Sequence, residues 1–218
     1  MTITHHLTDQ ILLAHAGGAL SEAFGLVVAA HLSMCDDCRA RLGAFEAVGG
    51  AILETCGTVP VDDGGLAATF ARIDAADRRG APAAQRARAP RRGPLPGPIA
   101  DYLGGGLDEV RWRPVGMGVR QAVLCTAEGA TARLLHIPAG VGVPDHGHRG
   151  LEMTLVLQGA FRDEWMRFGP GDVEIADAAT EHTPVAEPGA DCICLAATDA
   201  PLRFNAFLPR IAQTLLRI

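Results

Sequence analysis

One histidine and two cysteines lie close together near the start of the chain, in the stretch HLSMCDDC at residues 31–38. His31, Cys35 and Cys38 are spaced by four and three residues, so on helical backbone their side chains project toward one face. Imidazole and thiolate are zinc ligands, and a structural zinc site needs four ligands in a tetrahedron. The spacing therefore predicts a structural Zn²⁺ site that takes one further ligand from elsewhere.

The fourth ligand has three candidates among the nearby histidines. His5 and His6 precede the first expected helix, and His15 lies within it. His5 and His15 would have to lie on other faces of the helical segment, so His6 is favoured.

Two other interpretations of the same stretch compete with zinc. A reactive Cys-x-x-Cys pair needs a thiolate stabilised by positive charge or a helix N-terminus. Asp36 and Asp37 stand between the two cysteines, and their charges oppose a second negative charge. A thiol–disulfide switch is therefore disfavoured, and buried cysteines that only pack remain the alternative to a metal site.

A second group of metal-binding side chains lies about a hundred residues later, at His146, His148 and Glu152. Residues two apart on extended backbone point to the same side of a strand, and Glu152 begins the next β segment. His182 is the natural fourth ligand. Imidazole and carboxylate ligands on adjacent strands predict a divalent-metal site inside a barrel.

Chemistry beyond metal binding has little support near this second group. Glu164, Glu174 and Glu181 are the nearest candidates for a general acid or base, and all three are expected at solvated positions. Cys192 and Cys194 alternate on a probable strand and therefore share a face. If that face is the barrel interior, these thiols are possible sensing groups; small hydrophobic packing is the alternative.

The elements that must position these residues change type along the chain. Helical patterns begin with a cap at Thr8, open again at Ser21, and continue over 36–53 and 62–77, the last amphipathic through Leu66, Phe70 and Ile73. Short β segments bounded by turn residues follow later: VRQAVLCT, TARLLHIP, LEMTLVLQ, DVEIAD and DCICLAAT. Regularly spaced short strands are typical of a barrel or sandwich.

The stretch at residues 78–98, rich in Arg, Pro and Ala, shows no apolar periodicity and indicates a flexible linker. The predicted fold is therefore a multi-domain α + β chain: a small zinc-stapled helical bundle at 1–77, the linker at 78–98, and an all-β barrel at 99–218.

Charge and composition narrow the functional classes. Residues 1–77 carry ten acidic side chains against three arginines, whereas residues 78–98 carry six arginines and no acid. The acidic helical part does not suit direct nucleic-acid binding and suits a basic protein partner. No apolar run is long enough for a membrane span, and the first residues lack a signal-peptide pattern. A cytoplasmic protein is expected, in which six cysteines indicate metal binding or packing rather than disulfides.

These residues resemble two known families. Residues 1–77 are similar to the zinc-binding anti-sigma domain, in which His6, His31, Cys35 and Cys38 fall on the ligand positions. The second group matches the first cupin motif, Gly-x₅-His-x-His-x₃-Glu-x₆-Gly, at every position from 140 to 159. The second cupin motif is only partly kept, because Asp177, Ala179 and Ala186 replace its Pro, Gly and Asn.

The order of the two domains resembles the ChrR-type anti-sigma factors. The resemblance implies a non-enzymatic protein that holds an extracytoplasmic-function sigma factor in a 1:1 complex, with zinc in both domains. It also implies release of the sigma factor under oxidative stress such as singlet oxygen, with the cupin as sensor and a possible small ligand in its pocket. The alternative is a metal-dependent cupin dioxygenase or isomerase whose helical domain dimerises it.

Overall fold

The computed structural model describes residues 2–78, 95–127, 129–143, 146–147, 149–200 and 203–204. The four predicted helices are confirmed: α1 (Asp9–Ala16), α2 (Glu22–Leu32), α3 (Asp36–Thr55) and α4 (Gly65–Arg78). The Thr8 hydroxyl caps α1 by accepting the Ile11 amide at 3.3 Å. Asp36 and Asp37 occupy the first turn of α3, where the helix dipole favours negative charge.

The five predicted β segments are also confirmed. They form β2 (Val119–Ala127), β3 (Ala130–Ile137), β5 (Glu152–Gln158), β8 (Val173–Ala176) and β11 (Cys192–Thr198). With β1 (Arg113–Gly116) they make an antiparallel six-stranded sheet in the order β1-β2-β3-β11-β5-β8.

The second half of the chain also contains a short 3₁₀ helix, η1 (Leu107–Glu109), and seven other short elements. The seven are α5 (Gly97–Leu103), β4 (His146–Gly147), β6 (Phe161–Arg162), β7 (Arg167–Phe168), β9 (Glu181–His182), β10 (Val185–Ala186) and β12 (Arg203–Phe204). The short strands form two three-stranded sheets, β10-β6-β7 and β12-β4-β9. Helix α5 begins at Gly97, so its first two residues belong to the predicted linker, and Pro98 lies in its first turn.

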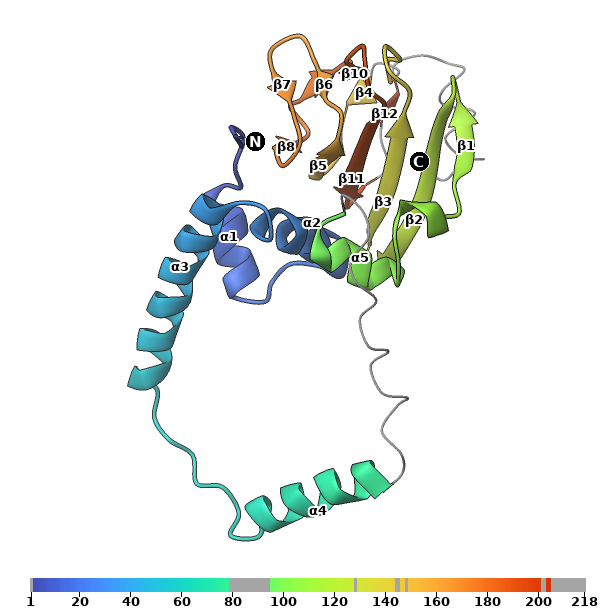
Figure 1. The fold of residues 1–218 in the computed structure, drawn as a ribbon. Helices are drawn as coiled ribbons and strands as arrows, with labels where there is room; N and C mark the ends of the chain where they lie inside the picture. Colours follow the sequence, from blue (N-terminus) through green and yellow to red (C-terminus); the bar gives the residue numbers. More distant parts are fainter. Residues whose placement is uncertain are drawn as a thin grey trace.

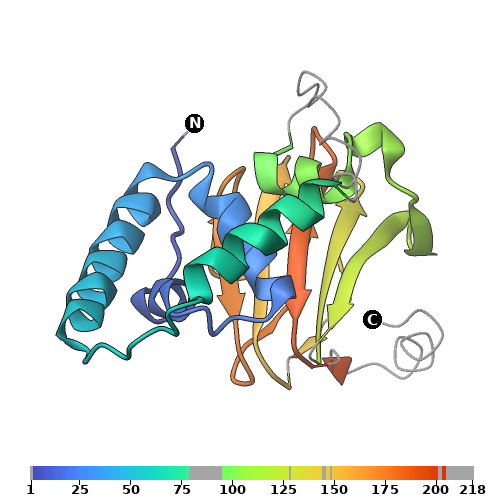
Figure 2. The same cartoon turned by 90° about the horizontal axis from the view of Figure 1, so that it is seen from below.

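The helical part and the sheet share one hydrophobic core. Helix α2 is buried around most of its circumference and lies across one face of the sheet, against β2, β3, β5 and β11 (Figures 1 and 2). Its apolar side chains join the outward-facing residues of the strands, such as Leu134, Leu155 and Leu195, in a single cluster. The linker is therefore not the only connection between the two parts.

Helix α4 stands away from the rest of the molecule in Figure 1. Its apolar side chains Leu66, Phe70 and Ile73 are 69%, 57% and 52% exposed. No helix in the described part of the chain has the length and apolar character that crossing a membrane requires.

Candidate metal centres

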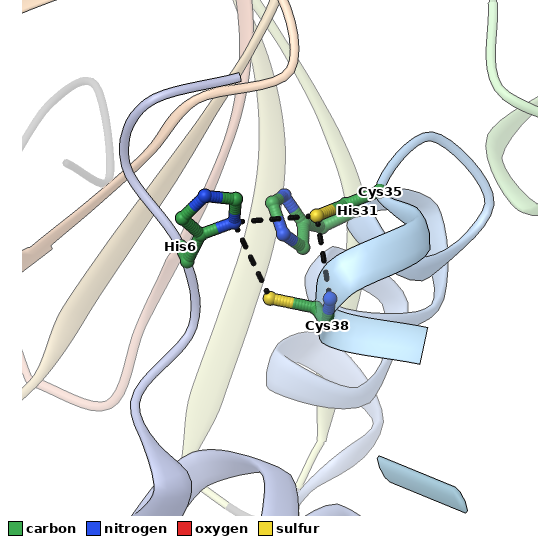
Figure 3. Close-up of side chains that lie close together, drawn as sticks. All are labelled: His6, His31, Cys35 and Cys38. Atoms are coloured by element: carbon green, nitrogen blue, oxygen red, sulfur yellow. Dashed lines mark hydrogen bonds between the residues drawn. The ribbon is translucent and has the colours of Figure 1, made fainter. Parts of the chain in front are cut away.

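Four side chains from three segments converge beside the sheet. His6 comes from the extended segment before α1, His31 from the last turn of α2, and Cys35 and Cys38 from the start of α3 (Figure 3). One ligand atom from each lies within 4.8 Å of all the others. His6 Nδ1 is 3.3 Å from Cys35 Sγ and 3.7 Å from Cys38 Sγ.

These distances suit a tetrahedral zinc ion. Zinc bonds of about 2.3 Å to sulfur and about 2.0 Å to nitrogen, held at the tetrahedral angle, separate the two ligand atoms by about 3.5 Å. The two nitrogen–sulfur distances of 3.3 and 3.7 Å lie on either side of that value. His31 Nε2 is buried and has no hydrogen-bond partner among the described residues, as expected of an atom reserved for a metal.

The electrostatics of the cluster also favour a cation. Burial lowers the pKa of His31, which keeps the imidazole neutral and able to coordinate. Burial, together with the neighbouring Cys35, raises the pKa of the Cys38 thiol. Two thiolates this close are stable only next to positive charge, which a divalent metal supplies at the shortest distance.

Arg41 is a residue of this site that the sequence patterns did not single out. Its guanidinium donates to the Leu7 carbonyl at 2.9 Å and lies 3.9 Å from Cys38 Sγ. The hydrogen bond with Asp9 raises the pKa of Arg41, so its charge is permanent. Arg41 therefore ties the segment after His6 to α3 and adds positive charge beside a thiol.

The other candidate histidines lie elsewhere. The His5 ring lies against Phe168, with ring centroids 4.5 Å apart, and 3.6 Å from the Asp172 carboxylate. His15 lies in the last turn of α1. Among the described residues, neither belongs to the cluster formed by His6 and its three neighbours.

The second candidate centre lies inside the barrel. His182 is buried, and its Nδ1 is 2.8 Å from Glu174 Oε1, which is also buried. Ligand atoms of Asp163, Glu174 and His182 lie within 4.8 Å of one another. The Glu174 hydrogen bond and charge outweigh burial, so the pKa of His182 is raised.

Glu152 lies on the same inner face of the sheet. Thr154 is paired with Glu174 across β5 and β8, and Glu152 lies two residues before Thr154 on the same side of the strand. Burial and the charge of Glu174 raise the pKa of Glu152 to about 7. Crowding of buried carboxylates around an imidazole is the arrangement that a divalent cation relieves.

The other two predicted ligands of the barrel site, His146 and His148, are described only in part. The backbone of His146 in β4 pairs with that of His182 in β9. His148 lies outside the described residues. Among the described residues, the group around His182 contains Asp163 and Glu174 but not Glu152. The predicted ligand set of His146, His148, Glu152 and His182 therefore stays a prediction.

The expectation that Glu174 is solvated was wrong, whereas Glu164 and Glu181 are exposed as expected. Strand β8 alternates, with Val173 on the side of the helices and Glu174 on the side of the barrel interior. The alternation of apolar and polar residues in VEIA was the sequence signal that could have predicted the burial of Glu174. One strand of four residues does not show which of its two faces lies inside the barrel.

Cys192 and Cys194 also face the barrel interior and are buried. A hydrogen bond with Cys192, together with burial, raises the pKa of Cys194 well above its ordinary value. The Cys194 thiol therefore stays protonated at neutral pH, and the nearby charges of Glu152 and Glu174 raise its pKa further.

Comparison with known proteins agrees with this architecture. Residues 105–201 match the family model described as the ChrR Cupin-like domain. The whole chain is 62% identical, over 218 residues and the full length of both proteins, to the anti-sigma-E factor ChrR of Cereibacter sphaeroides. It also resembles a chain in the crystal structure of Rhodobacter sphaeroides SigE in complex with the anti-sigma ChrR, with 58% identity and a TM-score of 0.76, over 91% of this chain and 100% of that one. A protein that matches an anti-sigma factor over its entire length, helices and barrel alike, belongs to the ChrR family of anti-sigma factors.

Proposed function

We propose that this protein binds and inhibits an extracytoplasmic-function sigma factor in a 1:1 complex in the cytoplasm. Residues 1–77 would hold the partner and residues 99–218 would sense oxidative stress. The observation that carries the proposal is the exposed apolar face of α4, in a chain 62% identical over its full length to an anti-sigma-E factor. A related chain has been crystallised with SigE.

The surface offered to the sigma factor is apolar and extends over two helices. Along α4, Leu66, Phe70 and Ile73 are exposed and recur at helical spacing, so they form one stripe. In the second half of α3, Val48 and Ile52 are exposed four residues apart. Apolar stripes of this kind on an otherwise hydrophilic helix are typical of a face that another protein covers.

Charge supports a basic partner. Residues 1–77 carry ten acidic side chains against three arginines. Such a segment attracts basic surfaces, including those with which a DNA-binding protein contacts phosphate. Occupying those surfaces is a direct way to inhibit a transcription factor.

Metal binding would give the helical part its rigidity. His6, His31, Cys35 and Cys38 would hold Zn²⁺, which would cross-link the N-terminal segment, α2 and α3. Arg41 and the cap that Cys35 makes on the Cys38 amide would hold α3 in the same orientation.

The barrel would supply the response to stress such as singlet oxygen. His146, His148, Glu152 and His182 would hold Zn²⁺ or another divalent metal, with Glu174 orienting His182. Cys192 and Cys194 are candidate sensing thiols because they lie near these carboxylates. A small ligand could occupy the same interior.

The experiment is a binding titration of the full chain with its cognate sigma factor. Phe70→Asp is expected to raise the dissociation constant by about 30-fold or more, since a central apolar contact contributes about 2 kcal/mol to binding. Trp165→Asp, a matched change at an 83% exposed apolar side chain on the barrel, should leave the affinity unchanged. Unaltered binding by Phe70→Asp would remove α4 from the interface.

The alternative function, a cupin enzyme, predicts a different result for the same protein sample. A cupin enzyme whose helices serve to dimerise it would sediment as a homodimer and would not bind the sigma factor. Membership of a family of regulatory anti-sigma proteins stands against it.

A further inference from the structure

The turn between β7 and β8, residues 169–172, contacts both histidine-bearing segments of the His₂Cys₂ cluster. This turn belongs to the barrel, yet Gly171 bonds the His31 ring and Asp172 accepts the amides of Thr4 and His5. Val173, the residue that follows the turn, donates its amide to the His5 carbonyl. The cluster and the turn are separated by 140 residues along the chain at His31 and Gly171.

The first contact concerns the His31 ring. His31 Nδ1 donates a hydrogen bond to the Gly171 carbonyl at 2.9 Å, and both partners are buried. The other ring nitrogen, Nε2, is buried and lacks a hydrogen-bond partner among the described residues. The His31 ring lies beside His6, Cys35 and Cys38 (Figure 3). A carbonyl that holds the proton on one ring nitrogen leaves the lone pair of the other nitrogen for a metal.

The second set of contacts concerns the segment that carries His6. Asp172 Oδ1 accepts the backbone amides of Thr4 at 2.7 Å and His5 at 2.9 Å. The Val173 amide donates to the His5 carbonyl at 3.2 Å, and the Gly169 amide holds the other Asp172 oxygen at 2.8 Å. These bonds lower the pKa of Asp172 despite its burial and fix the residue directly before His6.

We propose that residues 169–172 of the barrel form the outer shell of the metal site in the helical part. Gly171 and Asp172 are positioning residues: Gly171 selects the coordinating nitrogen of His31, and Asp172 sets the position of His6. Neither residue touches the metal. Outer-shell partners of this kind typically change metal affinity by about 10- to 100-fold when they are removed.

The start of β8 also contacts the candidate metal site in the barrel. Two residues after Asp172, the Glu174 carboxylate binds His182 at 2.8 Å. A displacement of β8 caused by a change at His182 therefore moves the groups that orient His6 and His31. This consequence rests on the proposed function, because only then does the geometry of the first site determine how firmly a sigma factor is held.

The test measures metal affinity in the full-length protein without any sigma factor, so its outcome is independent of the proposed partner. Co²⁺ bound by two thiolates gives charge-transfer absorption in the near ultraviolet, and Zn²⁺ competition converts this signal into a zinc affinity. Asp172→Ala is expected to weaken zinc at the thiolate site by about 10- to 100-fold. An affinity equal to that of the unaltered protein would overturn the proposal.

The matched control is Asp191→Ala. Asp191 also lies in a barrel turn, accepts a backbone amide at 3.0 Å from Ala139, and pairs with a histidine, His136, at 3.1 Å. Neither of these bonds involves His6, His31 or the segments that carry them, so removal of Asp191 should leave the thiolate-site affinity unchanged. An equal loss in both variants would mean that any weakening of the barrel lowers the affinity, which contradicts a positioning role.

A second measurement needs no substitution and stands even if Asp172→Ala fails to fold. Imidazole ¹⁵N chemical shifts of the zinc-loaded protein distinguish a protonated ring nitrogen from a metal-bound one. We expect His31 to carry its proton on Nδ1 and the metal on Nε2, and His6 to coordinate through Nδ1. Coordination of His31 through Nδ1 would refute the role given to Gly171.

Discussion

Substituting Leu195 by alanine tests whether the helices and the barrel fold as one unit. Leu195 lies in the middle of β11, directly between Leu134 of β3 and Leu155 of β5. All three side chains are 0% exposed, and they belong to the cluster that α2 completes. The change therefore opens a cavity at the junction of the two parts.

The expected loss follows from the burial. A buried Leu→Ala change costs about 2–5 kcal/mol, the larger values applying where the surroundings cannot collapse into the cavity. Strands on both sides hold Leu134 and Leu155 in fixed register, so the upper half of that range is expected. In a chain of this size each kcal/mol lowers the melting temperature by about 2–4 °C, which predicts a decrease of about 7–20 °C.

The assay follows two probes during one thermal ramp of the Co²⁺-loaded protein. Both tryptophans, Trp112 and Trp165, lie in the barrel part, so their fluorescence reports on the barrel. The thiolate-to-cobalt absorption reports on His31 and its neighbours. Because the core is shared, Leu195→Ala should shift both transitions together.

The control is Leu53→Ala in α3, where the leucine is 72% exposed and no shift is expected. The reasoning is refuted if the cobalt signal in Leu195→Ala persists at its original temperature while the tryptophan transition moves. That result would mean that the helices hold their metal without the sheet.

Three further predictions concern the individual sites. Cys35→Ala should lose the zinc of the helical part, leaving one metal fewer per chain by elemental analysis; full zinc content in this variant would contradict the assignment of Cys35. Glu174→Gln should weaken metal binding in the barrel by about 10- to 100-fold in a competition titration, whereas Glu181→Gln, at an exposed position, should not. Alkylation of the folded protein followed by mass spectrometry should label the exposed Cys56 and spare Cys192 and Cys194, because both are buried and the pKa of Cys194 is raised; rapid labelling of Cys194 would show that the barrel opens.

Much of the fold could be predicted from local sequence patterns. The amphipathic and capped segments predicted four helices, and alternation between turn residues predicted the five long strands, because helix and strand periods are properties of neighbouring residues. The short strands and α5 were not predicted. Two-residue strands such as β4 and β9 carry no period of their own and exist because a partner strand lies beside them.

The packing of α2 against the sheet was not predicted from the sequence. Helix α2, with the sequence EAFGLVVAAHL, is apolar on nearly all sides, and three short helices cannot cover such a surface. A helix of this composition needs a second layer, which the sheet provides. The pattern was visible in the sequence, but nothing in it identified the sheet as the layer.

By itself the sequence determined the grouping of His31, Cys35 and Cys38, since helix geometry alone brings residues three and four apart to one face. Tertiary structure decided that His6 rather than His5 joins them, that His31 Nδ1 bonds the Gly171 carbonyl, and that Glu174 faces His182. These contacts join segments up to 140 residues apart. They depend on how α2 and the N-terminal segment pack against the end of β8, and local periodicity holds no information about that packing.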